Sequence, residues 1–215
     1  MGQIIDTEIK YRPLTLDDYV FPNSDVKDVA TSYGTGKITR PLILCGTNGG
    51  GKSLLAELIP KAIEGFTPWV KRVRSCDLNS DKEIYSQLTR NKQFDMLFTV
   101  NDQRFNYIII EEVNFDPKSS DAFRVVLDDY RGVDLTIMTS NEVNKIDVGI
   151  RSRCEILVVP PCEPHVFLSR AKMIITAEGY SIEDQVLLSA LEAVYEVKAD
   201  NRLYYQKLDE MLRKA

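Results

Sequence analysis

The eight-residue run from Gly46 to Ser53, GTNGGGKS, constrains the fold of this 215-residue chain more than any other feature. The apolar run 41–45 precedes it, and a helical pattern over residues 53–65 follows it. A glycine-rich turn between a buried strand and a helix directs backbone N–H groups and the positive end of the helix dipole toward one point. We therefore predict a binding site for the phosphates of a nucleoside triphosphate, in preference to an ordinary glycine-rich turn.

Two side chains of this run have distinct expected roles. Lys52 is expected to reach the β- and γ-phosphates, and the Ser53 hydroxyl to be a ligand of Mg²⁺. The other residues that we expect to hold the nucleotide in this turn are Thr47, Asn48, Gly49, Gly50, Gly51 and Leu54.

Apolar, β-branched runs recur along the chain at intervals too long for hairpins. They cover residues 41–45, 69–74, 107–110, 135–140 and 155–159, and helical patterns over 53–65, 81–91 and 119–130 fill most of the gaps. This alternation predicts an α/β fold with a mainly parallel five-stranded sheet covered on both faces, and sites in such folds lie at the carboxyl ends of the strands. The segment Phe94–Val100 fits either a helix end or a short edge strand.

The pattern changes at the proline-rich segment 160–164. Everything after it favours helix, in three segments over residues 166–178, 182–197 and 201–213. We expect residues 1–160 to form the nucleotide-binding domain and residues 161–215 to form a small three-helix lid domain.

Composition limits the compartment and the partners. Hydrophobic residues make up 44% and charged residues 27%, as in soluble globular proteins, and no apolar stretch is long enough to span a bilayer. Cys45, Cys76, Cys154 and Cys162 are scattered, which disfavours zinc and disulfides and fits a reducing cytoplasm, or a host cytoplasm for a phage protein. The net charge of −5 restricts any DNA contact to a local basic face.

Two acids follow the run Tyr107–Ile110, which has the form of a Walker B strand. We expect Glu111 to hold the Mg²⁺ shell and Glu112 to polarise the attacking water. The alternative is a strand end with two solvated acids.

Polar residues near two later runs are further candidates. Asn141 ends the run 135–140 and is suited to bond both the water and the γ-phosphate, although an Asn that starts a turn is common. Arg151 and Arg153 precede the last strand. They are either a surface basic pair or contain a finger that reaches a neighbouring subunit's nucleotide.

Together these motifs resemble the AAA+ ATPase subunits of DNA polymerase clamp loaders, of the small-subunit replication-factor-C and phage type. The resemblance covers residues 5–213 in the family's order. Its segments are Glu8–Pro13 (the opening E-K-Y-R-P), Ala122–Tyr130 (the helix after Walker B), Thr139–Asn141 (the first sensor), Ile150–Cys154 (the S-R-C motif) and Ala199–Arg202 (the second-sensor helix).

The resemblance implies roles and partners. Arg153 would be the finger that acts in trans, Arg202 would contact the γ-phosphate, and Tyr11, Arg12 and Pro13 would lie near the base of the nucleotide. It implies ATP and Mg²⁺ as cofactors and an ATP hydrolysis that is nearly absent in a lone subunit. The implied partners are other AAA+ subunits, a sliding clamp or another protein client, and DNA.

The sequence departs from the family pattern in several places. Walker B has Glu-Glu in place of Asp-Glu, and Gly49–Gly51 replaces a loop that usually contains proline. The family's S-D-x-R-G stretch is replaced by residues 75–82, which leaves Lys82, Arg90 and Lys92 as basic candidates for DNA contact. The family continues into a helical collar, which we do not find after the third lid segment, so we expect assembly to rest on AAA+ contacts, on ATP at the seams, or on a partner.

Three functional hypotheses remain at this point. The first is an ATP-driven loader that acts on DNA, and the second is a AAA+ remodeller of a phage, mobile-element or defence system with another client. The third is an interaction module in which the nucleotide only stabilises an interface. Met96, Leu97 and Phe98 are either a clamp-contacting patch or a buried edge of the core.

Overall fold

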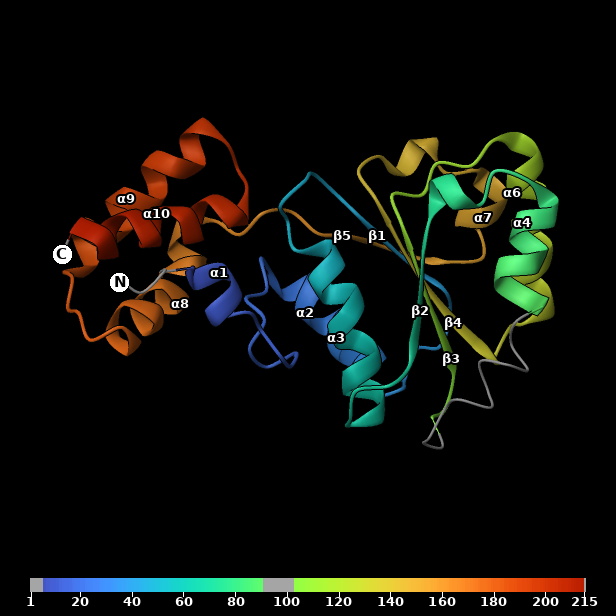
Figure 1. The fold of residues 1–215 in the computed structure, drawn as a ribbon, viewed down its shortest axis with the longest axis horizontal. Helices are drawn as coiled ribbons and strands as arrows, with labels where there is room; N and C mark the ends of the chain where they lie inside the picture. The colour runs from blue at the N-terminus through green and yellow to red at the C-terminus, as the bar shows by residue number, and fades with distance from the viewer. Residues whose placement is uncertain (1–5, 91–102, 215) are drawn as a thin grey trace, which may run out of the picture.

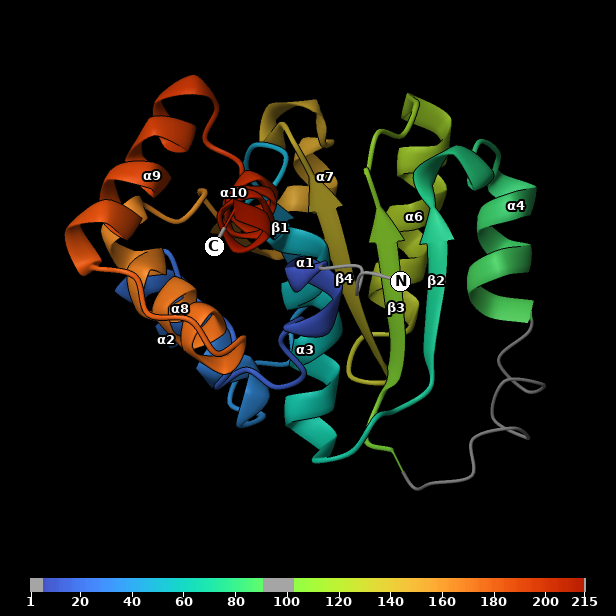
Figure 2. The same ribbon diagram turned by 60° about the vertical axis from the view of Figure 1, so that its left-hand side comes forward.

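A parallel β-sheet forms the centre of the computed structural model, which describes residues 6–90 and 103–214. Its five strands have the order β2-β3-β4-β1-β5, and every pairing between neighbours is parallel (Figures 1 and 2). The strands are β1 (Leu42–Cys45), β2 (Val70–Arg74), β3 (Asn106–Glu111), β4 (Asp134–Ser140) and β5 (Glu155–Val158). The predicted α/β fold is confirmed, and each predicted strand boundary lies within one residue of the observed one.

Helices cover both faces of the sheet, as Figure 1 shows. On one face lie α2 (Ser24–Gly34) and α3 (Lys52–Glu64), and on the other lie α4 (Asp81–Tyr85), α6 (Pro117–Asp129) and α7 (Val148–Arg151). Because side chains alternate along a strand, β1 contributes Leu42 and Leu44 to the first layer and Ile43 and Cys45 to the second. Both layers are thus anchored on the strand that leads into the glycine-rich turn.

Side-chain caps fix the starts of the covering helices. The Asn23 side chain accepts a hydrogen bond from the backbone N–H of Val26 at 2.9 Å, and Asp116 accepts one from Ser119 at 2.8 Å. The helix α2 was not predicted, although its buried residues Val26, Ala30 and Tyr33 recur at helical spacing. The short helix α1 (Thr7–Lys10) was not predicted either.

The predicted helix over residues 81–91 is shorter than expected. It is α-helical only over Asp81–Tyr85 and continues as a π-helical turn, η2 (Ser86–Arg90). The hydroxyl of Ser86 donates to the Glu83 carbonyl and competes with the regular backbone ladder. Lys92, the ambiguous segment Phe94–Val100 and the triplet Met96–Phe98 within it lie outside the described residues.

The C-terminal helices α8 (Pro164–Ala177), α9 (Asp184–Val197) and α10 (Asn201–Lys214) surround a cluster of their own. Its centre contains Phe167, whose ring stacks on Tyr204 with centroids 4.7 Å apart. The helix α1 packs beside α10 (Figure 2), where the backbone N–H of Thr7 donates to Asp209 Oδ1 at 3.0 Å. Of the predicted helices here, α9 begins two residues later than expected. Over residues 6–90 and 103–214, no helix combines the length and apolar character needed to cross a membrane.

Replacing Phe123 by alanine is expected to lower the free energy of unfolding by about 3–5 kcal/mol. The Phe123 side chain in α6 is 1% exposed and its ring lies 5.0 Å from that of Phe115, so its removal opens a cavity under the sheet. Val125→Ala in the same helix, where the side chain is 45% exposed, is the matched control and should change the value by less than about 0.5 kcal/mol. Urea denaturation of both variants measures the difference, and similar losses in the two would contradict this assignment of the core.

Candidate functional site

A cavity of about 620 Å³ lies between the carboxyl ends of the strands and the C-terminal helices. Most of the predicted site residues line it: Arg12, Pro13, Asn48, Gly49, Gly51, Lys52, Ser53, Leu54, Glu112, Asn141 and Arg202. Those that do not line it are Tyr11, Thr47, Gly50, Glu111 and Arg153. The fold therefore brings side chains from the start, the middle and the end of the sequence to one place.

Glycine is required in the turn between β1 and α3 because the backbone there approaches other chain segments closely. Gly46 has φ of 142°, and a β-carbon on it would overlap the carbonyl oxygen of Val159. A β-carbon on Gly50 would lie 2.7 Å from the same oxygen. Gly51, with φ of 90°, is the N-cap of α3. The turn therefore stays open as a cradle whose first helical residue is Lys52.

Lys52 joins the glycine-rich turn to the end of β4. Its ammonium donates to the carbonyls of Gly46 and Thr47, each at 2.7 Å, and to Asn141 Oδ1 at 3.2 Å. The side chain is 8% exposed, and burial lowers the pKa of Lys52 below its ordinary value. The two positions predicted to face the terminal phosphate are thus in direct contact.

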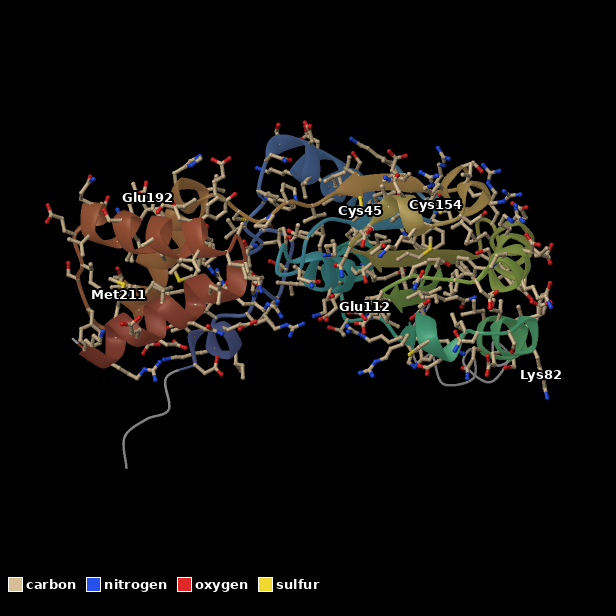
Figure 3. All side chains as sticks on the ribbon, turned by 90° about the horizontal axis from the view of Figure 1, so that it is seen from above. Cys45, Lys82, Glu112, Cys154, Glu192 and Met211 are labelled. Carbon is tan, nitrogen blue, oxygen red and sulfur yellow. The ribbon has the colours of Figure 1, made fainter. Side chains whose placement is uncertain are left out.

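The two acids at the end of β3 point to different surroundings. Glu112 lines the cavity and lies between the sheet and the C-terminal helices (Figure 3). Among the described residues it is the non-glycine residue with positive φ, 55°, and its backbone N–H donates to Thr139 Oγ1 at 3.2 Å. Glu111 instead lies 3.9 Å from a guanidinium nitrogen of Arg72. The two consecutive carboxylates thus have different neighbours, Glu111 beside Arg72 and Glu112 at the cavity.

The donors around the glycine-rich turn fit Mg²⁺ only together with phosphate oxygens. Among the described residues, no three His, Cys, Asp or Glu side chains gather into a metal cluster. The Ser53 hydroxyl and the carboxylates at the end of β3 supply oxygen, the ligand that Mg²⁺ prefers. Because Mg²⁺ is commonly bound by one or two carboxylates plus substrate phosphates, this small donor set is adequate.

The opening segment approaches the site through Arg12 rather than Tyr11. Arg12 lines the cavity and donates to Glu57 Oε2 at 2.7 Å, and Arg72 forms an ion pair with the other oxygen of Glu57 at 2.8 Å. Burial raises the pKa of Glu57, but the guanidinium groups of Arg72 and Arg12 outweigh it and hold that pKa below its usual range. Tyr11 donates its hydroxyl to Glu178 at 2.7 Å and packs with the C-terminal helices.

Arg153 is held away from the cavity of its own chain. Its Nε donates to Asp128 Oδ1 at 2.8 Å, its Nη2 donates to Asp128 Oδ2 at 2.7 Å, and its Nη1 donates to the Gly149 carbonyl at 2.8 Å. The side chain is 35% exposed. The Asp128 carboxylate raises the pKa of Arg153, so the guanidinium is charged at this surface.

Part of the cavity lining was not predicted from the sequence. The lining residues that were not predicted are Glu8, Ile9, Tyr19, Val20, Thr139, Ser140, Cys162, Phe167, Asn201 and Tyr205. Thr139, Ser140 and Asn201 lie inside motifs already recognised, so their positions offered a signal. Phe167 and Tyr205 offered none, because they read as ordinary core residues of helices.

The basic candidates for DNA contact are only partly described. Lys82 is exposed on α4, and Figure 3 shows it at the far end of the sheet domain from Glu112, which lines the cavity. Its neighbours in the first turn of that helix, Asp81 and Glu83, are acidic. Arg90 ends η2, and Lys92 lies outside the described residues.

Three curated proteins with similar sequences are replication factor C small subunits. A replication factor C small subunit 1 from Pyrobaculum islandicum is 24% identical over 189 residues, which cover 87% of this chain and 56% of that protein. A replication factor C small subunit from Methanococcus maripaludis is 29% identical over 177 residues, 81% of this chain and 55% of that protein. One from Picrophilus torridus is 27% identical over 192 residues, 87% of this chain and 58% of that protein.

The chain is similar in sequence to replication factor C small subunits. These similarities confirm the resemblance to clamp-loader subunits that the motifs indicated. No protein-family model matches the sequence. The chain spans about half the length of the curated relatives it matches, between 55% and 58% in these three cases.

Proposed function

We propose that this chain binds ATP in the cavity and hydrolyses it. One observation carries the proposal: Lys52, Glu112, Asn141 and Arg202, from four separate segments, meet around one cavity behind a glycine-rich cradle. Cationic, amide and carboxylate groups in this arrangement are what phosphoryl transfer to water requires. The similarity to replication factor C small subunits supports the same reading.

Each residue then has a role in the reaction. Lys52 exchanges its bonds to the Gly46 and Thr47 carbonyls for phosphate oxygens, and Asn141 orients the attacking water. Glu112 accepts a proton from that water, and Arg202 donates to the terminal phosphate. Ser53 and Glu111 would hold Mg²⁺, which supplies charge stabilisation on the phosphates when it is bound. For that role Glu111 gives up its weak pairing with Arg72.

The proposed domain division follows the clusters of buried side chains. Residues 1–160 would form the nucleotide-binding domain and residues 161–215 the lid. The separate cluster around Phe167 and Leu208 supports the lid as a unit. The packing of α1 and Tyr11 onto α8–α10 indicates that the opening segment moves with the lid.

We further propose that the chain acts in an oligomer, as a clamp-loader-type ATPase that loads or remodels a protein on DNA. Arg153 supports this, because it does not line its own cavity and presents a charged guanidinium at the surface. An arginine supplied by a neighbour is a recurring device in phosphoryl transfer. We include a sliding clamp as the protein client because the sequence resembles clamp-loader subunits, and the similarity to replication factor C small subunits supports that resemblance.

A second candidate is a AAA+ remodeller or ATP-dependent interaction module with a client other than a clamp. The first turn of α4 favours it, since Asp81 and Glu83 flank the single basic residue Lys82. Two acids at that position disfavour an approach to the phosphate backbone of DNA. A DNA dependence of the ATPase separates the two candidates.

Lys52→Ala is expected to weaken ATP binding about 100-fold, because charge-assisted hydrogen bonds to phosphate each contribute about 1.5–3 kcal/mol. Lys61→Ala, in the last turn of the same helix and outside the cavity lining, is the matched control and should leave the affinity within about twofold. Titration of each purified variant with a fluorescent ATP analogue measures the dissociation constants. An unchanged affinity in Lys52→Ala would overturn the phosphate site.

A further inference from the structure

The residue before α10, Asp200, is a buried acid beside the glycine-rich turn. Its side chain is 3% exposed and does not line the cavity, whereas Arg202, which does, has a side chain that is 54% exposed. Both Asp200 oxygens accept from that guanidinium: Oδ1 from Nε at 3.0 Å and Oδ2 from Nη2 at 2.8 Å. A buried carboxylate outside the cavity lining therefore holds the guanidinium that lines the cavity.

This bidentate grip leaves the guanidinium able to bind a second anion. An arginine has five N–H donors in a planar fork, and Asp200 uses one on Nε and one on Nη2. The donors on Nη1 and the second donor on Nη2 form the other edge of the fork, which suits a phosphate. A terminal phosphate can then bind Arg202 without displacing Asp200.

The same acid joins α10 to the glycine-rich turn. Oδ1 of Asp200 accepts the backbone N–H of Arg202 at 3.1 Å, as an N-cap does, and the backbone N–H of Asn201 donates to the Gly49 carbonyl at 3.1 Å. A β-carbon on Gly49 would overlap the Asp200 carboxylate. The turn must have glycine there for the acid to occupy this position, so the arginine is placed relative to the cradle itself.

We propose that Asp200 is a positioning residue that fixes the guanidinium of Arg202 over the phosphate cradle and so sets the preference for ATP over ADP. The inference rests on the proposed role of Arg202 at the terminal phosphate. Without the grip, a long arginine side chain that is half exposed loses its fixed orientation, and the entropy of holding it is added to the cost of binding ATP.

The test is a double-mutant cycle on nucleotide affinity. All variants carry Glu112→Gln, so that bound ATP is not turned over, and ATP and ADP dissociation constants are measured by calorimetry. Asp200→Asn keeps the shape and an N-cap but removes the charged bidentate grip. We expect it to reduce the ATP-to-ADP preference about tenfold, with ADP affinity within about twofold. Combining it with Arg202→Gln should cost no more than Arg202→Gln alone, since the two residues act as a unit.

Asp184→Asn is the matched control, because this lid acid pairs with Lys172 on the surface and should leave both affinities unchanged. Thermal unfolding without nucleotide checks each variant. If Asp200→Asn fails to unfold cooperatively, Asp200→Ser takes its place, since serine caps the helix but cannot grip a guanidinium. An unchanged ATP-to-ADP preference in Asp200→Asn would overturn the role of Asp200 but not that of Arg202. Additive losses of ATP affinity in the double variant would do the same. An unchanged preference in Arg202→Gln would overturn the proposed role of Arg202, and this inference with it.

Discussion

Replacing Arg153 by alanine should lower the ATP turnover of assembled subunits by about 10³-fold or more, while one subunit still binds ATP within about twofold of the original affinity. This difference between turnover and binding follows from the location of Arg153. Arg153 does not line the cavity of its own chain, so it has no route to the nucleotide bound there. In the proposed oligomer it would reach a nucleotide across a subunit seam, where its charge would stabilise the transition state.

The variant should remain folded, because the pair with Asp128 is exposed and contributes little to stability. Arg151→Ala is the comparison that identifies the correct arginine, since both residues precede β5. Turnover is measured over a range of protein concentrations, with ATP binding measured in parallel. A loss of ATP binding by the single subunit would place Arg153 in its own site. A loss of turnover in Arg151→Ala alone would show that the finger is the other arginine.

Replacing Glu112 by glutamine should lower turnover by about 10²–10⁴-fold and leave ATP bound, the range typical of removing a general base. Glutamine keeps the length of the side chain and its place in the cavity but cannot accept the proton. The backbone at Glu112, with φ of 55° and a bond to Thr139, is unaffected by this change because it does not involve the carboxylate. Single-turnover hydrolysis with prebound ATP isolates the chemical step from binding.

Two other acids provide comparisons for this experiment. Glu142→Gln removes an exposed carboxylate that pairs with Lys145, and it should leave turnover unchanged. Glu111→Gln should raise the Mg²⁺ concentration needed for half-maximal turnover, because Glu111 is proposed to hold the ion. Normal turnover in Glu112→Gln together with a severe loss in Glu111→Gln would reverse the two assigned roles.

The glycine-rich turn and the strand ends were predictable because their signals are local. The spacing from Gly46 to Ser53 and the acids after Ile110 lie within single strand–turn segments, and the topology of a parallel sheet brings their ends together. The direct contact between Lys52 and Asn141 follows from the same rule, since β1 and β4 are neighbours.

The rest of the site depends on long-range packing that no local pattern encodes. Phe167 and Tyr205 line the cavity only because α8 and α10 fold back over the strand ends. Glu111 was expected beside the metal, but in this structure it faces Arg72, which the neighbouring strand β2 brings near it. Asp200 lies within the segment Ala199–Arg202, but two of its contacts became visible only in three dimensions. These are its bidentate bonds to Arg202 and its close approach to Gly49, which leaves no room for a β-carbon there.

The central claim is best tested by steady-state ATP hydrolysis of the purified protein, alone and with primed-template DNA, using Glu112→Gln as the blank. We expect slow hydrolysis by the protein alone and strong stimulation by DNA, because closure of an assembly on DNA would bring Arg153 to a neighbour's nucleotide. Hydrolysis that does not respond to DNA would contradict the loader and favour a protein client. The absence of hydrolysis above the Glu112→Gln blank under both conditions would contradict the proposed ATPase itself.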